Sequence, residues 1–151
     1  MGTRYSVNES TGVITTAGGI SLPTSGGTAT DLDYYEEGTH TTTWGGAMSP
    51  AVSGDVVFTR NGNIVTLLFP LTTDDTPANA TMTMTTVLPA RLRPTALLRF
   101  SIIRINSGSD GFGRMDIATD GNITIGKNAS LAAFDTGAEA GIFPTCISYC
   151  I

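Results

Sequence analysis

The chain has 151 residues, of which 40% are hydrophobic and only 14% are charged, and its net charge is −5. The length fits one domain with a hydrophobic core. The acidic balance argues against nucleic-acid binding, which needs clustered Lys and Arg, and no apolar run approaches the roughly 20 residues of a membrane-spanning helix. Because about a quarter of a typical chain is charged, we expect Thr, Ser, Asn and Gly to supply much of the polar surface and contacts between identical subunits to cover the rest.

The first 30 residues differ from the rest of the chain. They include the Gly- and Thr-rich stretches "GVITTAGGI" (residues 12–20) and "TSGGT" (residues 24–28), which offer little material for a core. We expect residues 1–30 to form a narrow stalk or trimerisation lead in which three copies wind around one another, followed by a head domain over residues 31–151. No apolar stretch follows Met1-Gly2, so the sequence predicts no secretory signal.

Two hairpins give the strongest local signals. In the first, residues 56–60 and 63–69 flank Asn61-Gly62, and in the second, residues 114–119 and 122–125 flank Asp120-Gly121. These dipeptides favour two-residue turns in which both residues take positive φ. Each hairpin therefore predicts a pair of antiparallel strands.

Further strands follow from the alternation of side chains. Residues 81–85 alternate Thr with Met, and residues 97–105 predict a long, well-buried strand. Residues 145–151 carry apolar groups on both faces, which predicts a central strand buried on both sides. Residues 128–134 predict a short strand or turn, and no segment gives a convincing helix. The spacing of these elements predicts an all-β, antiparallel β-sandwich.

The two cysteines, Cys146 and Cys150, lie on the predicted last strand. Four residues of extended chain span about 13 Å at about 3.3 Å per residue, whereas the Cα atoms of a disulfide lie within about 7 Å. We therefore expect two small core residues. Pairing with symmetry mates around a trimer axis is the alternative, and a metal site lacks a second pair of ligands.

Several short segments, in order, carry a resemblance to a known family. "LDYYEEGT" (residues 32–39) follows the lead "SGGTAT" (residues 25–30), and "LPARLRP" (residues 88–94), "DGNITI" (residues 120–125) and "ISYCI" (residues 147–151) come after it. Together they resemble the C-terminal domain of phage and large-virus tail-fibre or spike proteins. The match covers most of residues 20–151.

The resemblance implies a jelly-roll head similar to the tumour-necrosis-factor and complement heads. Such a head is a homotrimer on a virion surface appendage and binds a host cell-surface receptor, commonly a glycan. Here the aromatic that usually follows the Gly-Thr of the motif is delayed until Trp44. The family defines no universal binding residues, so none is transferred. A structural trimerisation, decoration or minor capsid module without receptor binding is the alternative.

Four residues are candidates for ligand binding. Trp44, beside Gly45 and Gly46, offers a face for sugar stacking, although burial in the core is the alternative. Tyr35 and His40, the only histidine, are further candidates, with subunit contact as the alternative for each. Arg104 lies near Arg91, Arg93 and Arg99 in the sequence, and this set fits either an acidic sugar or phosphate or ion pairs at a subunit interface.

The sequence predicts no catalytic residue. His40 lies in a Thr-rich run, and no Gly-x-Ser-x-Gly motif is present. Glu36 and Glu37 would point to opposite faces of a strand, so they cannot act together on a glycosidic bond. Asp31 and Asp33 could share a face and bind Ca²⁺, but a solvated junction is the expected arrangement. We therefore expect a protein that is not an enzyme and has no metal or other cofactor.

Overall fold

The computed structural model describes residues 5–8, 13–16, 20–22, 30–32, 35–106, 109–136 and 139–151. The chain divides into two compact units, Met1–Tyr35 and Glu36–Ile151. In the first unit, β1 (Tyr5–Asn8) pairs with β2 (Val13–Thr16), and β3 (Ile20–Leu22) pairs with β4 (Thr30–Leu32), both antiparallel. Asp33 lies outside the described residues, and the role of residues 1–30 as a stalk stays a prediction.

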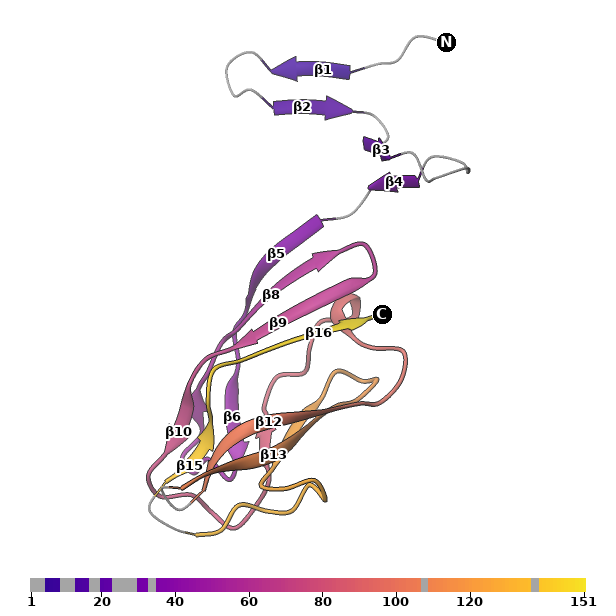
Figure 1. Cartoon of the computed structure of the whole chain (residues 1–151). Helices are drawn as coiled ribbons and strands as arrows, with labels where there is room; N and C mark the ends of the chain where they lie inside the picture. The colour runs from indigo at the N-terminus through magenta and orange to yellow at the C-terminus, as the bar shows by residue number, and fades with distance from the viewer. Residues whose placement is uncertain are drawn as a thin grey trace. The chain divides into compact units, whose positions relative to one another are not determined.

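The rest of the chain forms two sheets (Figure 1). The four-stranded sheet has the order β16-β9-β8-β5 and contains β5 (Tyr35–His40), β8 (Val56–Asn61), β9 (Ile64–Phe69) and β16 (Thr145–Cys150). The eight-stranded sheet has the order β10-β15-β12-β13-β14-β11-β6-β7. Its strands are β6 (Thr43–Gly46), β7 (Val52–Ser53), β10 (Thr72–Asp74), β11 (Met82–Met84), β12 (Leu98–Asn106), β13 (Ser109–Ile117), β14 (Ile123–Gly126) and β15 (Ala140–Ile142).

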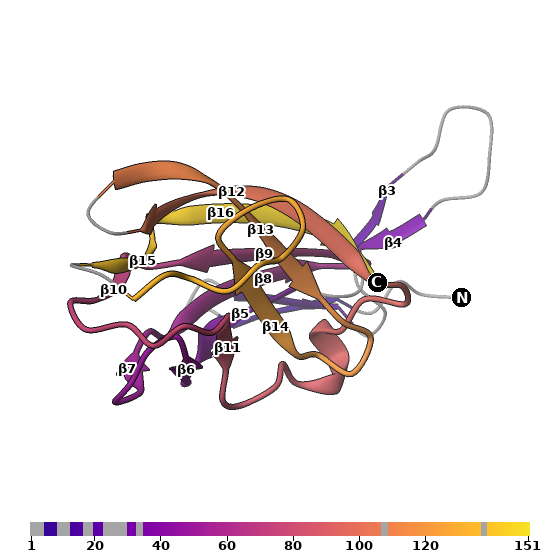
Figure 2. The ribbon, with the colours of Figure 1, turned by 90° about the horizontal axis from the view of Figure 1, so that it is seen from below.

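The predicted all-β, antiparallel sandwich is confirmed. The strands pair antiparallel, as β8 does with β9 and β12 with β13, and two views at right angles show the two sheets as the layers of this unit (Figure 2). The described residues contain no α-helix, only the 3₁₀ turn η1 (Ala90–Leu92) that follows Pro89. The jelly-roll connectivity of the tumour-necrosis-factor heads and the homotrimer stay predictions.

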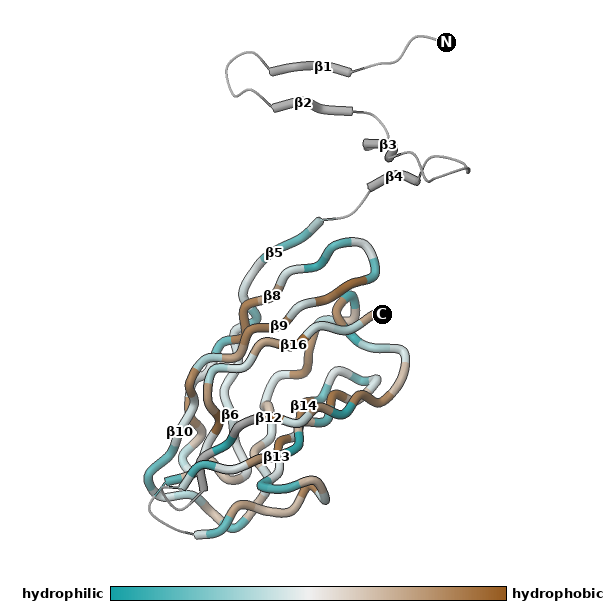
Figure 3. Tube along the Cα trace, viewed as in Figure 1, coloured by the Kyte–Doolittle hydropathy of each residue, from teal (hydrophilic) through white to brown (hydrophobic). Residues whose placement is uncertain are grey.

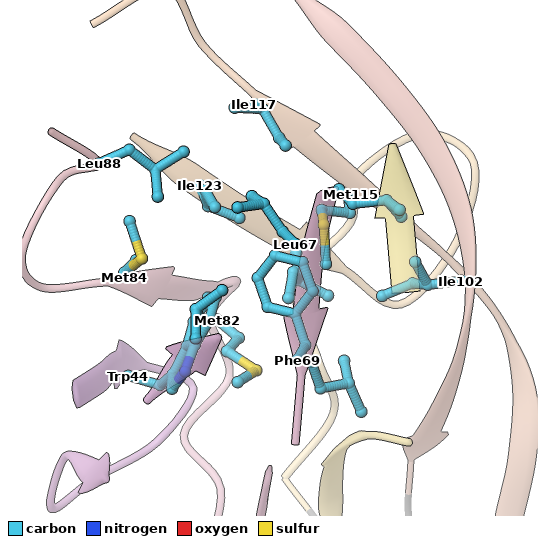
Figure 4. Close-up of a cluster of buried hydrophobic side chains, with 14 of the residues drawn as sticks. Trp44, Leu67, Phe69, Met82, Met84, Leu88, Ile102, Met115, Ile117 and Ile123 are labelled. Atoms are coloured by element: carbon cyan, nitrogen blue, oxygen red, sulfur yellow. The ribbon is translucent and has the colours of Figure 1, made fainter. Parts of the chain in front are cut away.

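The core lies between the two sheets. Leu67 and Phe69 of β9 face Met115 of β13 and Ile123 of β14, and all four side chains are fully buried (Figure 4). The alternation along β11 buries its methionines and leaves its threonines nearer the surface, as predicted. A strand in such a sandwich buries every second side chain, so each outer face consists of the residues between the core residues.

The first hairpin is confirmed, but its turn is shifted by one residue. Asn61 pairs with Ile64, so the two turn residues are Gly62 and Asn63 rather than Asn61 and Gly62. Gly62 has φ +56°, and Leu131 is the only non-glycine among the described residues with positive φ. A turn that needs positive φ only at its first central position accepts Gly-Asn, so Asn61 can stay in the strand.

The second hairpin is also confirmed with a different turn. β13 ends and β14 begins around the pair Ile117–Ile123, so the loop is longer than two residues. The Gly121 amide donates to the Ala118 carbonyl, and Gly121 has φ +87°. The Asp120 carboxylate accepts from the Asn122 amide at 2.9 Å. Asp120 therefore stabilises the loop through its side chain, and only the glycine takes the left-handed conformation.

The prediction for the last strand was wrong in two respects. β16 lies at an edge of the four-stranded sheet rather than at its centre, and only one of its faces is buried. Ile147 and Tyr149 point into the core, whereas Cys146 and Cys150 are free and exposed rather than core residues. Cysteine and serine are small and weakly polar, so the alternation could not show which face was buried.

The predicted strand over residues 97–105 is confirmed as β12, but it is not buried on both faces. Ile102 is buried and Phe100 is half-buried against the core, whereas Arg99 and Ser101, which point the other way, are exposed. β12 is therefore amphipathic, with one face in the core and the other on the surface of the eight-stranded sheet.

The Tyr149 hydroxyl links β16 to η1, and its burial leads us to expect that the protein loses stability at alkaline pH. Its hydroxyl donates to the Leu92 carbonyl at 2.5 Å, and burial raises the pKa of Tyr149. Because the folded state holds the phenol neutral, its contribution is complete below the ordinary tyrosine pKa of about 10 and falls as pH rises above it. Tyr149→Phe should lower the free energy of unfolding by about 1–3 kcal/mol near neutral pH, since Leu92 loses its donor.

Urea unfolding measured near neutral pH and again well above the ordinary tyrosine pKa tests this. The wild-type protein should lose stability between the two conditions more steeply than Tyr149→Phe does. Equal losses in the two proteins would show that Tyr149 does not carry the alkaline effect.

Candidate functional site

Trp44 is a core residue and not a sugar platform. The side chain is fully buried, its ring centroid lies 6.2 Å from that of Phe69 on the opposite sheet, and its Nε1 donates to the Gly54 carbonyl at 3.0 Å. No face of the indole is open to a ligand. The binding role predicted for Trp44 is therefore corrected in favour of burial, because the ring fills the space between the sheets.

His40 and Tyr35 lie on β5. The Nε2–H of His40 donates to the Thr86 carbonyl at 2.8 Å, which ties β5 to the segment after β11. Tyr35 is 65% exposed. His40 thus has a structural partner, and the binding roles of both residues stay predictions.

Arg104 lies on the inner face of the β12–β13 ribbon, opposite Gly111. Its guanidinium rests against Gly111, where an added Cβ would lie 2.7 Å from Nη2, and its stem passes Gly113. The Nε donates to the Lys127 carbonyl at 2.8 Å. Arg104 therefore holds the ribbon against the loop after β14, and its predicted role in ligand binding stays a prediction.

The other three arginines of the predicted set lie at separate places. Arg91 forms a bidentate ion pair with Glu36, with N···O distances of 2.6 and 2.9 Å, and its guanidinium carbon lies 5.7 Å from the Phe58 ring centroid. The Nε of Arg93 donates to the Leu88 carbonyl at 2.7 Å. Of the set, only Arg99 combines high exposure with a place on an open sheet face, and it does so near residues that the sequence did not single out.

Phe112 is the exposed aromatic that the sequence analysis missed. It lies on the outer face of β13 and is 79% exposed, more than any other large hydrophobic side chain in the described part of the chain. It stands between Gly111 and Gly113. Residues 111–113 precede the strand predicted over residues 114–119, so the sequence indicated no direction for the Phe112 side chain.

A network of ionised side chains lies on the same outer face. Both carboxylate oxygens of Asp116 accept hydrogen bonds from Arg114, each at 2.6 Å, and the Arg99 Nε lies 3.8 Å from one of them. These hydrogen bonds raise the pKa of Arg114. Asp116 is thus shared by two cations, and the guanidinium of Arg99, whose side chain is 61% exposed, faces solvent.

Asp74 and Asp55 accept hydrogen bonds from backbone amides. The Asp74 carboxylate accepts the backbone amides of Thr76 and Ser49, each at 2.9 Å, and the bond from Thr76 is the main reason why the pKa of Asp74 is lowered. Asp55 accepts from the Thr42 amide at 3.0 Å. No group of three or more His, Cys, Asp or Glu that could hold a metal ion occurs among the residues described, and no helix among them is long and apolar enough to cross a membrane.

Comparisons with known proteins find similarity in structure but not in sequence. No protein-family model matches the chain, and no curated protein matches it. The chain is similar in structure to the reovirus attachment protein sigma1, solved in complex with α-2,3-sialyllactose, with a TM-score of 0.49 and 14% sequence identity. The similarity covers 97% of this chain and 85% of that one.

Because Gly54 contacts Trp44, we expect alanine substitution at Gly54 and at Gly45 to differ sharply in their effect on stability. In Gly54→Ala the new Cβ would lie 2.7 Å from the indole Cδ1, whereas at Gly45 it would meet only the Thr85 methyl at 3.5 Å. Overpacking of this kind costs about 1–3 kcal/mol. Gly54→Ala should therefore destabilise the fold and shift the emission of the only tryptophan to longer wavelength, while Gly45→Ala should leave both nearly unchanged.

Chemical unfolding followed by tryptophan fluorescence measures both effects. Equal changes in unfolding free energy and emission wavelength in the two variants would contradict the close packing of Gly54 against Trp44.

Proposed function

We propose that this chain is a non-catalytic head domain of a virion appendage and that it binds a host cell-surface glycan as a homotrimer. The order of the motifs from "LDYYEEGT" to "ISYCI" supports the class of protein. The antiparallel sandwich is the scaffold that this class uses. The observation in this structure that carries the proposal is Phe112, an aromatic side chain left 79% exposed on a strand whose other face is sealed in the core.

The absence of catalysis is part of the proposal. Glu36 and Asp116 form ion pairs with Arg91 and Arg114, and Asp74 accepts the Thr76 amide. His40, the only histidine, donates to a backbone carbonyl. These partners support structural rather than catalytic roles for the groups that hydrolysis of a glycan would require.

Binding of the intact chain to cells and glycans tests the receptor role. The fluorescently labelled protein should bind susceptible host cells and a subset of arrayed glycans, and enzymatic removal of surface glycans should abolish cell binding. Single sites in such systems are weak, and three copies add avidity. A protein that forms trimers but binds neither cells nor glycans would support the structural module instead, and turnover of host polysaccharide would contradict the non-catalytic role.

The outer face of the four-stranded sheet supports self-association. Its strands place three residues in each row across β16, β9 and β8. The rows are Cys146–Leu68–Val57, Ser148–Thr66–Thr59 and Cys150–Ile64–Asn61.

None of the nine residues in these rows carries a charge. Leu68 and Val57 are each 46% exposed and Ile64 is 53% exposed, and brown stretches along β9 mark its apolar residues (Figure 3). The hydroxyls of Thr66 and Ser148 lie 2.8 Å apart and satisfy each other. An uncharged, partly apolar face of this kind suits an interface between identical subunits from which water is excluded. Such an interface agrees with the low charge of the chain.

Leu68→Glu should break this contact. The new carboxylate can stay in water in a single chain, because Leu68 is 46% exposed there, but it would be desolvated between subunits. Light scattering at micromolar concentration should give the mass of three chains for the wild-type protein and of one chain for Leu68→Glu. Leu71→Glu is the matched control, since Leu71 is 55% exposed and lies between β9 and β10, outside these rows.

The thiols give a second measurement. Alkylation of Cys146 and Cys150 should be slow in the wild-type protein and fast in Leu68→Glu. A single-chain mass for the wild-type protein, or equal thiol reactivity in both, would show that this face is not a subunit interface.

A further inference from the structure

The outer face of the β12–β13 ribbon brings an exposed ring, a hydroxyl and cations into one row of side chains. β12 and β13 pair over nine positions, from Leu98–Ile117 to Asn106–Ser109. Because Phe100, Ile102 and Met115 point into the core, the residues between them point outward. Among the side chains that the structure describes, the outward ones are Arg99 and Ser101 on β12 and Asp110, Phe112, Arg114 and Asp116 on β13.

We propose that this outer face binds an anionic oligosaccharide, with one sugar ring stacked on Phe112 and a carboxylate or sulfate held by Arg99. The inference rests on the proposed receptor role and assigns it a place and a class of ligand. Phe112, 79% exposed, offers its ring to the C–H face of a sugar. Ser101, exposed between the two ends of the row, offers a hydroxyl to the sugar hydroxyls.

The charged residues of this face define the orientation expected for the ligand. Arg114 already occupies both oxygens of Asp116, so the 61% exposed side chain of Arg99 keeps donors for an anion. Asp110 lies on the same face beyond Phe112, at the end away from Arg99. The anionic group is therefore expected at the Arg99 end, and the neutral sugar toward Asp110.

The spacing fits a ligand of two or three sugars. Arg99 pairs with Asp116, which is four residues along β13 from Phe112. At about 3.3 Å per residue these positions lie about 13 Å apart. This backbone separation is longer than one monosaccharide, and a short acidic oligosaccharide is long enough to span it.

The ribbon is held in place before any ligand binds. Arg104 anchors the opposite face of the ribbon through its bond to the Lys127 carbonyl, and Arg114 Nη1 donates to the Ala129 carbonyl at 2.9 Å. Both bonds tie β12 and β13 to the loop after β14. A fixed platform loses little freedom on binding, which suits a site that recognises a flexible sugar.

The test compares matched ligands on the intact chain. Oligosaccharides that end in a carboxylated sugar should bind at least ten times more tightly than the same compounds as methyl esters. Raising the salt concentration should remove that advantage. Sulfated oligosaccharides form a parallel arm, and a preference for them would identify sulfate as the anion at the same site.

Two variants separate the two parts of the site. Arg99→Gln should abolish the preference for the carboxylate over the methyl ester, and Phe112→Ala should weaken both ligands tenfold or more. Arg91→Gln and Leu71→Ala are the matched controls, since Arg91 is also a partly exposed arginine in an ion pair and Leu71 is also an exposed apolar residue. Thermal unfolding should show all four variants folded.

Unchanged glycan and cell binding in both site variants would overturn this site while leaving the receptor role intact. No binding of glycans or cells by the wild-type protein would instead remove the receptor role itself. A fall in mass from three chains to one in Phe112→Ala would assign Phe112 to a contact between copies and so overturn the sugar platform.

Discussion

The contact between the two sheets is the interaction on which the rest of the head depends. Trp44 brings the largest side chain from the eight-stranded sheet to Phe69 of the four-stranded sheet, and the Gly54 carbonyl receives its only polar hydrogen. No side chain larger than hydrogen fits at Gly54 beside this ring without displacement. Once these residues are fixed inside, the alternation of each strand decides which residues face outward.

The two outer faces that result are chemically different. The nine residues in the rows across β16, β9 and β8 carry no charge. On the other sheet, the outer face of β12 and β13 carries Arg99, Arg114 and Asp116 within two neighbouring strands. On the four-stranded sheet the charged residues lie outside these rows, as Glu36 and Glu37 do on β5. Composition alone suggested buried surface between subunits, but only the register shows which three strands form an uncharged surface.

The sequence predicted the elements better than it predicted their surroundings. Alternation and turn residues were enough to locate the hairpins and the strand at residues 81–85, because local sterics and burial of one face act within a few residues. The turn of the first hairpin was misplaced by one residue because Asn61-Gly62-Asn63 contains two acceptable dipeptides, and pairing between the strands selects Gly62-Asn63.

The sequence predicted long-range features less well. The two faces of β16 could not be ranked from "TCISYC", since cysteine fits either environment and the place of a strand in a sheet depends on distant partners. The sequence allowed either a buried or an exposed Trp44, and packing against the facing sheet buries it. Phe112 was missed because the strand predicted over residues 114–119 stops short of it, whereas β13 begins at Ser109 and its register with β12 turns Phe112 outward.

The glycines beside Phe112 explain how one strand can serve two faces. Glycine weakens the interior of a strand, because it adds freedom and no packing. Here Gly111 and Gly113 leave on the inner face the space that the Arg104 side chain occupies, since an added Cβ would lie 2.7 Å from its Nη2 and 2.9 Å from its Cγ. Arg104 in turn stabilises the ribbon, because its Nε donates a hydrogen bond to the Lys127 carbonyl. Phe112 points to the opposite, outer face, so the Gly-Phe-Gly segment combines a firmly held backbone with an exposed aromatic side chain.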